Sequence, residues 1–243
     1  MVIINADDFG MNKSCSRAIA QAFSKGYVTN ATMMATGGYF DEAVALAKEQ
    51  GFFDRIGIHF SLTEGVPLTE AICCVSDFVS DGRFHKRYDP QKPLIVSEEN
   101  AVYEELTAQV MKLKSAGIRI THADSHHYLH NAPFLAPVFV RVCREQGIER
   151  IRLQRNLGVS ENADAINAFY RAQGLRTTEY FGRLRDLEDI DIPDNTEILV
   201  HPDFDKDGRL IDRRGMEDGY PVGVLLPDLK TRRAIVLGSY KDL

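Results

Sequence analysis

Apolar residues recur at three- and four-residue spacing in five segments of the chain, and each of these segments ends in glycine. The segments are SRAIAQAFSKG, DEAVALAKEQG, EELTAQVMKLKSAG, PVFVRVCREQG and ADAINAFYRAQG, ending at Gly26, Gly51, Gly117, Gly147 and Gly174. The spacing predicts amphipathic helices, and glycine after the last turn is typical of a helix stop in the left-handed conformation. Ser97 is an expected N-cap, because Glu98 and Glu99 follow it in the first turn.

β-branched and apolar runs alternate with these helices and predict strands. The runs lie near residues 2–7, 29–36, 55–62, 119–126, 149–154, 197–201 and 233–239. Strict alternation of strand and helix favours a parallel sheet. About seven such units predict an α/β fold, a single-domain irregular (β/α) barrel over residues 1–243. An open doubly wound sheet is the alternative, although its nucleotide-binding version would place G-x-G-x-x-G after the first strand.

Residues 63–97 form the longest stretch without a strand or helix pattern. The stretch contains the turn pair Asp81-Gly82 and three prolines. Long loops in compact domains are usually functional, and this one follows the third expected strand. We therefore expect it to lie over the active-site face of the barrel, with a disordered surface excursion as the alternative.

Composition and charge exclude several classes of protein. The net charge is −6, with acidic and basic residues mixed along the chain, which argues against a nucleic-acid partner. No apolar run is long enough for a membrane span, and MVIINADDFG lacks the regions of a signal peptide. The cysteines, at positions 15, 73, 74 and 143, form no C-x-x-C pair, so we expect reduced thiols and a cytoplasmic protein.

Carboxylates and imidazoles stand at the carboxyl ends of four expected strands. The first strand ends in Asp7 and Asp8, the third in His59, the fourth in His122, Asp124 and His126, and the sixth in His201. These ends converge on the active-site face of an α/β barrel. One aspartate and two histidines around an open position suit a catalytic divalent metal, and a second carboxylate can take a proton from bound water.

Asp7 and Asp8 would supply both carboxylate roles from adjacent positions. Neighbouring residues of a regular strand point to opposite faces, so one of the two must lie where the strand bends, and Gly10 favours such a bend. Taken singly, Asp8 would be a helix N-cap and His59 a hydrogen-bonded interior histidine. Only their coincidence at matching strand ends predicts a metal site.

Five segments resemble the YdjC-like carbohydrate deacetylases, a family that includes the chitooligosaccharide (diacetylchitobiose) deacetylases. They are NADDFG at 5–10, GIHFSLTEG at 57–65, THADSHHYLH at 121–130, HPDF at 201–204 and the final LGSYKDL. The resemblance implies a barrel like that of polysaccharide deacetylases and metal-dependent hydrolysis of N-acetyl groups from N-acetylglucosamine-containing oligosaccharides. The chain departs from the family's HLDSHHH and LHLNLTEG patterns at positions that include Ala123, Tyr128, Phe60 and Ser61, none of them a proposed ligand.

The resemblance also implies roles for individual residues by motif position. It assigns Asp8, His59 and His126 to one divalent metal, Asp7 to the base and His201 to the acid. The family is associated with Mg²⁺, whereas related deacetylases often use Zn²⁺, and another transition metal is compatible with the same ligands. Other candidates near the substrate or behind the ligands are His122, Asp124, Arg152, Arg155, Phe84 and Tyr88.

Two pairs among these candidates have stated tasks. Arg152 or Arg155, at the end of the fifth expected strand, is expected to hold Asp7 ionised, and a surface arginine pair is the alternative. Phe84 and Tyr88, in the long loop, are expected to stack on a pyranose face.

Other functions remain open from the sequence. Metal-dependent phosphoesterases and cyclic amidohydrolases use similar barrels, but they carry H-x-H on the first strand, where this chain has Asp7 and Asp8. Lactam-utilisation proteins are a closer alternative. A non-catalytic sugar-binding barrel would need neither Asp7 nor His201. The expected partner is a small oligosaccharide, and the frequency of two-fold oligomers favours a homodimer.

Overall fold

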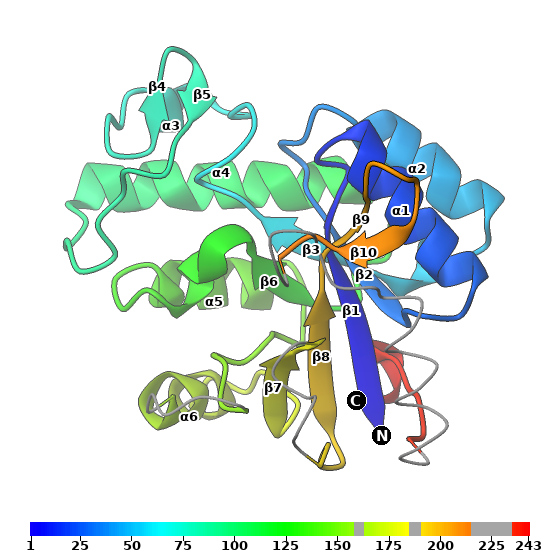
Figure 1. Ribbon diagram of the computed structural model, residues 1–243. Coiled ribbons are helices and arrows are strands. Elements are labelled where there is room, and N and C mark those ends of the chain that lie inside the picture. The colour runs from blue at the N-terminus through cyan, green and yellow to red at the C-terminus, as the bar shows by residue number, and fades with distance from the viewer. Residues whose placement is uncertain (158–162, 185–190, 215–234) are drawn as a thin grey trace.

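The computed structural model describes residues 1–157, 163–184, 191–214 and 235–243 (Figure 1). Its centre is a parallel sheet with the strand order β6-β3-β2-β1-β8-β7. The strands are β1 (Val2–Phe9), β2 (Asn30–Met33), β3 (Ile56–Phe60), β6 (Ala123–Ser125), β7 (Tyr180–Arg183) and β8 (Thr196–Val200). From β1 the order runs outward through β2, β3 and β6 on one side, and on the other side β8 lies next to β1 with β7 beyond it. This is the cyclic order of a barrel, whereas in a doubly wound sheet the later strands run outward in chain order on the second side as well. The expected barrel-like α/β fold is therefore confirmed.

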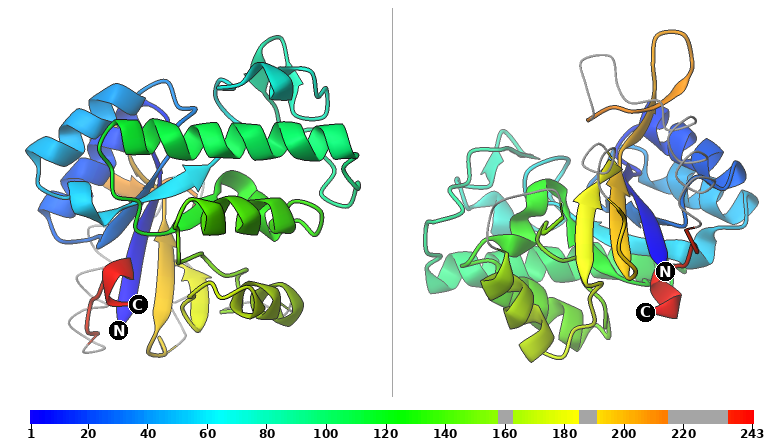
Figure 2. Two further views of the ribbon diagram at one scale, coloured as in Figure 1. Left: turned by 180° about the vertical axis from the view of Figure 1, so that it is seen from behind. Right: turned by 60° about the horizontal axis from the view of Figure 1, so that its bottom comes forward.

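The segment at 149–154, expected as a strand, forms only isolated bridges. Ile151 bridges to Ala123 of β6, and Arg150 bridges to Arg176. Further along, the amides of Asn156 and Leu157 both donate to the carbonyl of Phe181 in β7. The segment therefore runs between the two edge strands, and the sheet is a curled half-barrel whose gap is filled by irregular chain (Figure 2). β7 itself was not expected from the sequence.

Helices surround the curled sheet (Figures 1 and 2). They are α1 (Lys13–Ser24), α2 (Phe40–Glu49), α4 (Val96–Ser115), α5 (Ala136–Glu145) and α6 (Asp164–Ala172). All five expected glycine stops have a positive φ, between 65° and 87°, so these stops are confirmed. The expected N-cap is wrong, because α4 begins at Val96 and places Ser97 inside the first turn. The Glu98 carboxylate instead accepts a hydrogen bond from the amide of Ile95.

The stretch at 63–97 contains short elements of its own. They are α3 (Glu70–Cys73), β4 (Val79–Ser80) and β5 (Arg83–Phe84). We call this stretch the excursion. It lies beside α4 at the upper left of Figure 1, on the side toward which β1 runs. The excursion therefore begins at the carboxyl edge of the sheet, where the candidate side chains were expected.

A hairpin follows β8 and packs against the first helix. It consists of β9 (Pro202–Phe204) and β10 (Leu210–Asp212). Ser14 of α1 donates a hydrogen bond to Asp203 of β9. The hairpin therefore returns the chain to the carboxyl end of β1.

The two ends of the described chain lie side by side (Figures 1 and 2). Leu237 forms a parallel bridge with Val2. Of the expected strand at 233–239, residues 233 and 234 lie outside the described residues. The 3₁₀ turn η4 (Tyr240–Asp242) follows, with Tyr240 fully buried. Throughout the described ranges, no helix combines the length and the apolar character that crossing a membrane requires.

Candidate active site

Both carboxylates at the end of β1 reach one site because the strand is irregular at Asp8. Asp8 has a φ of 70°, and the pairing of β1 with β2 shifts register between Ala6 and Phe9. Side-chain alternation is therefore interrupted between the two aspartates. The expected bend exists, but it lies at Asp8 itself as well as at Gly10, whose φ is 88°. A left-handed aspartate is a strained conformation of the kind found at functional sites.

Three candidate ligand atoms converge at this bend. The Oδ1 atom of Asp8 lies 3.1 Å from Nε2 of His59 and 2.8 Å from Nδ1 of His126. The two nitrogens are 3.3 Å apart, and all three side chains are buried. Asp8 Oδ1 has no hydrogen-bond partner of acceptable geometry among the described residues. Ligands held at about 2.1 Å and at right angles lie about 3.0 Å apart, so this group fits a divalent cation.

A second aspartate orients the first of the two histidines. The Nδ1 atom of His59 lies 2.7 Å from Oδ1 of Asp124, and the hydroxyl of Thr32 donates to Oδ2 of Asp124 at 3.0 Å. A proton on Nδ1 leaves the Nε2 lone pair facing Asp8. Burial disfavours the charged imidazole, but Asp124 and Asp7 outweigh burial and raise the pKa of His59 to about 10. The carboxylates around His59 therefore favour positive charge at this point, which either a second proton on Nε2 or a divalent cation bound by Nε2 would supply.

Asp7 is held by a buried arginine. Nη1 and Nη2 of Arg152 lie 2.7 Å from Oδ2 and Oδ1 of Asp7, and Asn5 donates to Oδ1 at 2.9 Å. Burial alone would raise the pKa of Asp7, but Arg152 and His59 hold it well below the usual range. Asp7 is therefore ionised. Arg155, the other arginine considered, is half-buried and does not line the cavity described next.

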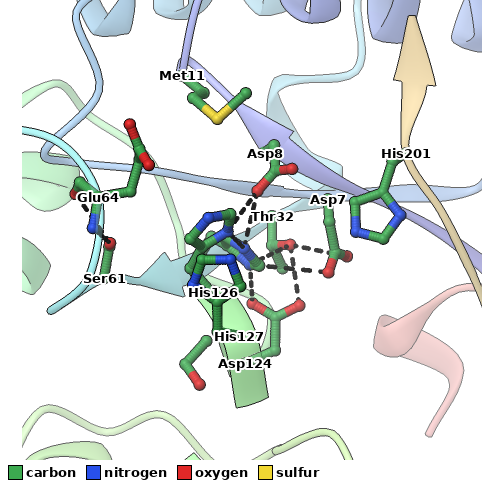
Figure 3. Close-up of polar contacts among 12 residues, drawn as sticks. Asp7, Asp8, Met11, Thr32, Ser61, Glu64, Asp124, His126, His127 and His201 are labelled. Carbon is green, nitrogen blue, oxygen red and sulfur yellow. Dashed lines mark hydrogen bonds and ion pairs between the residues drawn. The ribbon is translucent and has the colours of Figure 1, made fainter. Parts of the chain in front are cut away.

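A cavity of about 410 Å³ opens beside these side chains. His201, which follows β8, is half-buried and lines the cavity with Asp7, and its amide donates to Asp212 at 3.2 Å. In Figure 3, Asp7 lies between His201 and His126. The remaining lining residues are His59, Ser125, His126, His127, Tyr128, Arg183 and Arg214. The cavity thus joins the candidate base, acid and metal group.

Several residues of the site were given no role from the sequence. His127 and Tyr128 have φ values of 55° and 56°, in the 3₁₀ segment η2 (His126–Asn131), and His127 Nδ1 lies 2.9 Å from the hydroxyl of Thr63. Arg213, just after β10, contacts the second oxygen of Asp8. The adjacent pair His126-His127 is a signal that the sequence contains. No spacing in the sequence predicts that a hairpin brings Arg213 to Asp8 at the end of β1.

Three expected positions lie away from the cavity. Phe84 and Tyr88 are buried, and Tyr88 stacks on Phe78 with a ring separation of 4.6 Å. Their rings belong to the core of the excursion, which corrects the expectation that they stack on a pyranose. His122 is also buried and does not line the cavity. Its ring stacks on Tyr240, and its Nε2 atom lies 3.1 Å from Oδ1 of Asn5.

Comparisons with known proteins agree with this arrangement. Residues 1–223 match the family model described as YdjC-like protein. A carbohydrate deacetylase of Brevibacillus brevis is 32% identical over 211 residues, covering 84% of this chain and 81% of the relative. A carbohydrate deacetylase of Listeria welshimeri is 32% identical over 208 residues, with the same shares covered.

A solved structure supports the fold. It comes from Enterococcus faecalis V583 and is described as a "putative cellobiose-phosphate cleavage protein". Its TM-score is 0.75 at 24% identity, with 99% of this chain and 97% of that chain covered. At this identity the likeness concerns the fold alone.

Proposed function

Since this chain belongs to the YdjC-like protein family, we propose that it is a metal-dependent carbohydrate deacetylase. It removes N-acetyl groups from N-acetylglucosamine-containing oligosaccharides. The carbohydrate deacetylase class is supported by relatives that bear this name. The observation that carries the proposal is the convergence of three buried ligand atoms beside an arginine-held carboxylate, on one cavity.

Asp8, His59 and His126 would hold the ion. Their geometry fits this task, because Asp8 Oδ1 is buried without a hydrogen-bond partner of acceptable geometry among the described residues. A divalent ion held by these residues would lower the pKa of a water molecule and polarise the acetyl carbonyl. We propose Mg²⁺ from the family resemblance. Two imidazoles and a carboxylate also suit Zn²⁺ and other transition metals, so metal analysis of the purified protein has to identify the ion.

Asp7 acts as the general base. Its carboxylate is ionised and aimed by Arg152, with two contacts of 2.7 Å. It takes the proton of the attacking water when the water adds to the acetyl carbon. Because Arg152 stays charged, the low pKa of Asp7 makes it a weak base whose value lies in alignment.

His201 donates a proton to the leaving amine. An amine leaves poorly until it is protonated, and His201 lies beside Asp7 and lines the same cavity (Figure 3). The carboxylate of Asp212 accepts from the backbone amide of His201 at 3.2 Å and lies 3.7 Å from its Nδ1. This contact fixes the position from which His201 acts.

The excursion covers part of the sugar. Its first residues support this, because the Thr63 hydroxyl contacts the cavity residue His127 at 2.9 Å. Phe84 and Tyr88 have no part in this proposal. Tyr128 and Arg183 line the cavity and are better placed to touch a pyranose.

Acetate release from short chitooligosaccharides tests the function. The protein should release acetate, should lose this activity after chelation, and should regain it when Mg²⁺ or Zn²⁺ is restored. Full activity in the chelated, metal-free protein would exclude the metal-dependent mechanism. Absence of acetate release with every restored metal would exclude the deacetylase assignment.

A further inference from the structure

The guanidinium of Arg152 has a second buried partner beyond the proposed base. Its Nε and Nη2 atoms both lie 2.7 Å from Oε1 of Glu197. Its Nη1 also lies 2.6 Å from Oδ2 of Asp124. With the two contacts to Asp7, five short contacts match the five N–H donors of arginine. The orientation of Arg152 is therefore fixed from every side.

Glu197 is in turn held by the last described element of the chain. Its Oε2 accepts a hydrogen bond from the hydroxyl of Tyr240. The Tyr240 ring stacks on His122 with 3.6 Å between ring centroids and an angle of 10°. The Tyr240 amide donates to Oδ1 of Asn30 at 3.2 Å. Tyr240, Glu197 and Arg152 are all fully buried.

This chain of contacts reaches Asp7 from the amino-terminal end of β8, whereas the cavity lies at the carboxyl ends of the strands. Glu197 lies near the start of β8, whereas His201 follows its end, so Glu197 and Tyr240 do not line the cavity. They touch neither the proposed ligands nor the space for substrate. Glu197 reaches Asp7 through Arg152, whereas Tyr240 has a second route that runs through His122 and Asn5 to Asp7.

We infer that Glu197 and Tyr240 are positioning residues that clamp Arg152 and thereby aim the carboxylate of Asp7. The inference rests on the proposed deacetylase function. It also assigns a role to the final LGSYKDL segment, which contains Tyr240. Without Glu197, two N–H donors of Arg152 lose their acceptor. The guanidinium then turns toward the remaining carboxylates, and Asp7 turns with it. A misplacement of about 1 Å costs roughly 10²-fold in rate.

Replacement of Glu197 tests the clamp directly. Glu197→Ala should lower kcat by about 10–100-fold, the usual effect of losing a partner behind a reacting group, with KM and metal content unchanged. Glu197→Gln should regain most of this loss, because its amide oxygen still accepts from Nε. Tyr240→Phe should lower kcat by about 2–10-fold, the worth of one hydrogen bond.

Two matched variants measure the effect of lost buried contacts elsewhere. Glu105→Gln changes another fully buried carboxylate, which accepts from the amides of Leu68 and Thr69. Tyr170→Phe removes the hydroxyl of another fully buried tyrosine, which donates to a backbone carbonyl. Both should lower the melting temperature with kcat within about 2-fold of wild type. A kcat loss in these controls equal to that of Glu197→Ala would overturn the inference.

A double-mutant cycle identifies the residue through which Glu197 acts. In an Asp7→Asn background, Glu197→Ala should change the residual kcat by less than about 2-fold. An equal loss in both backgrounds would overturn the inference. Weaker metal binding by Glu197→Ala would also overturn it, because Glu197 would then act through Arg152 on Asp124 rather than on Asp7. If the wild-type chain releases no acetate, the proposed function fails and this inference fails with it. If the wild type is active and Glu197→Ala has the same effect in both backgrounds, this inference is wrong and the proposed function stands.

Discussion

The Nδ1 atom of His59 lies 2.7 Å from Oδ1 of Asp124, and this contact leaves Nε2 free to face Asp8. An asparagine at position 124 can present an N–H to Nδ1 and favour the wrong tautomer. Asp124→Asn should therefore lower metal affinity by about 10–100-fold. Titration calorimetry with the metal-free protein measures this change.

Asp77→Asn is the control for that experiment. Asp77 pairs with Lys92 in the excursion and touches neither the ligand group nor its partners. Its metal affinity should equal that of wild type. An Asp124→Asn protein with wild-type affinity would show that the contact to His59 does not govern binding.

The two neighbouring aspartates should respond differently to the same substitution. Asp7→Asn keeps its size but loses basicity, so it should retain metal while kcat and kcat/KM fall together by about 10²–10⁴-fold. Asp8→Asn should lose metal affinity, and added metal should restore part of its activity. Elemental analysis and steady-state kinetics on both proteins separate the two results.

The opposite pattern would reverse the assignments. Rescue of Asp7→Asn by metal would exchange the two roles, and near-normal turnover of Asp7→Asn would remove the base from the mechanism. His126→Ala should also lose its metal while keeping the fold. Stoichiometric metal in that variant would point to His127, which lines the same cavity.

The four free cysteines should fall into two pairs by reactivity. Cys73 and Cys74 are exposed, whereas Cys15 and Cys143 are buried. Burial raises the pKa of Cys15 to about 11 and that of Cys143 to about 12, which leaves little thiolate at neutral pH. A thiol-specific chromogenic reagent at pH 8 should label two equivalents quickly. The other two should react only after denaturation, and four fast equivalents in the folded protein would contradict the burial.

Gly57 should resist replacement because its neighbour leaves no room. A Cβ at this position would lie 2.5 Å from the ring of His122 and 2.7 Å from its carbonyl. Gly57→Ala should destabilise the fold by about 1–3 kcal/mol, which lowers the melting temperature by roughly 2–12 °C. Gly38→Ala is the matched control, since a Cβ there meets nothing within 4 Å. Equal melting temperatures for the two variants would refute the close packing.

The strand ends were predictable because a local signal marks them. Asp8, His59 and His126 each follow an apolar run, and parallel strands bring such ends together. The glycine helix stops were predictable for the same reason, since a left-handed residue is a local requirement. The sequence therefore indicated the group of candidate ligands before any distance was known.

The partners around this group depend on distant parts of the chain. Arg152 was one of the two arginines expected to hold Asp7, but its segment forms isolated bridges only, so the sequence could not choose between Arg152 and Arg155. Arg213 returns to Asp8 through a hairpin, and no hydrophobic period predicts its position. Phe84 and Tyr88 are aromatic residues of the kind that stack on sugars. In the structure they are buried, and they form a small core within the excursion.

The clamp on Asp7 also has a consequence for the order of synthesis. Tyr240 leaves the ribosome more than two hundred residues after Asp7. At about 5–20 residues per second, that interval is roughly 10–50 s. Until residues 196–200 are made, β1 lacks its β8 neighbour, and Arg152 gains Glu197 before it gains the support of Tyr240. The nascent chain thus carries the carboxylates of Asp7 and Asp8 long before the contacts that hold Asp7 in place can form.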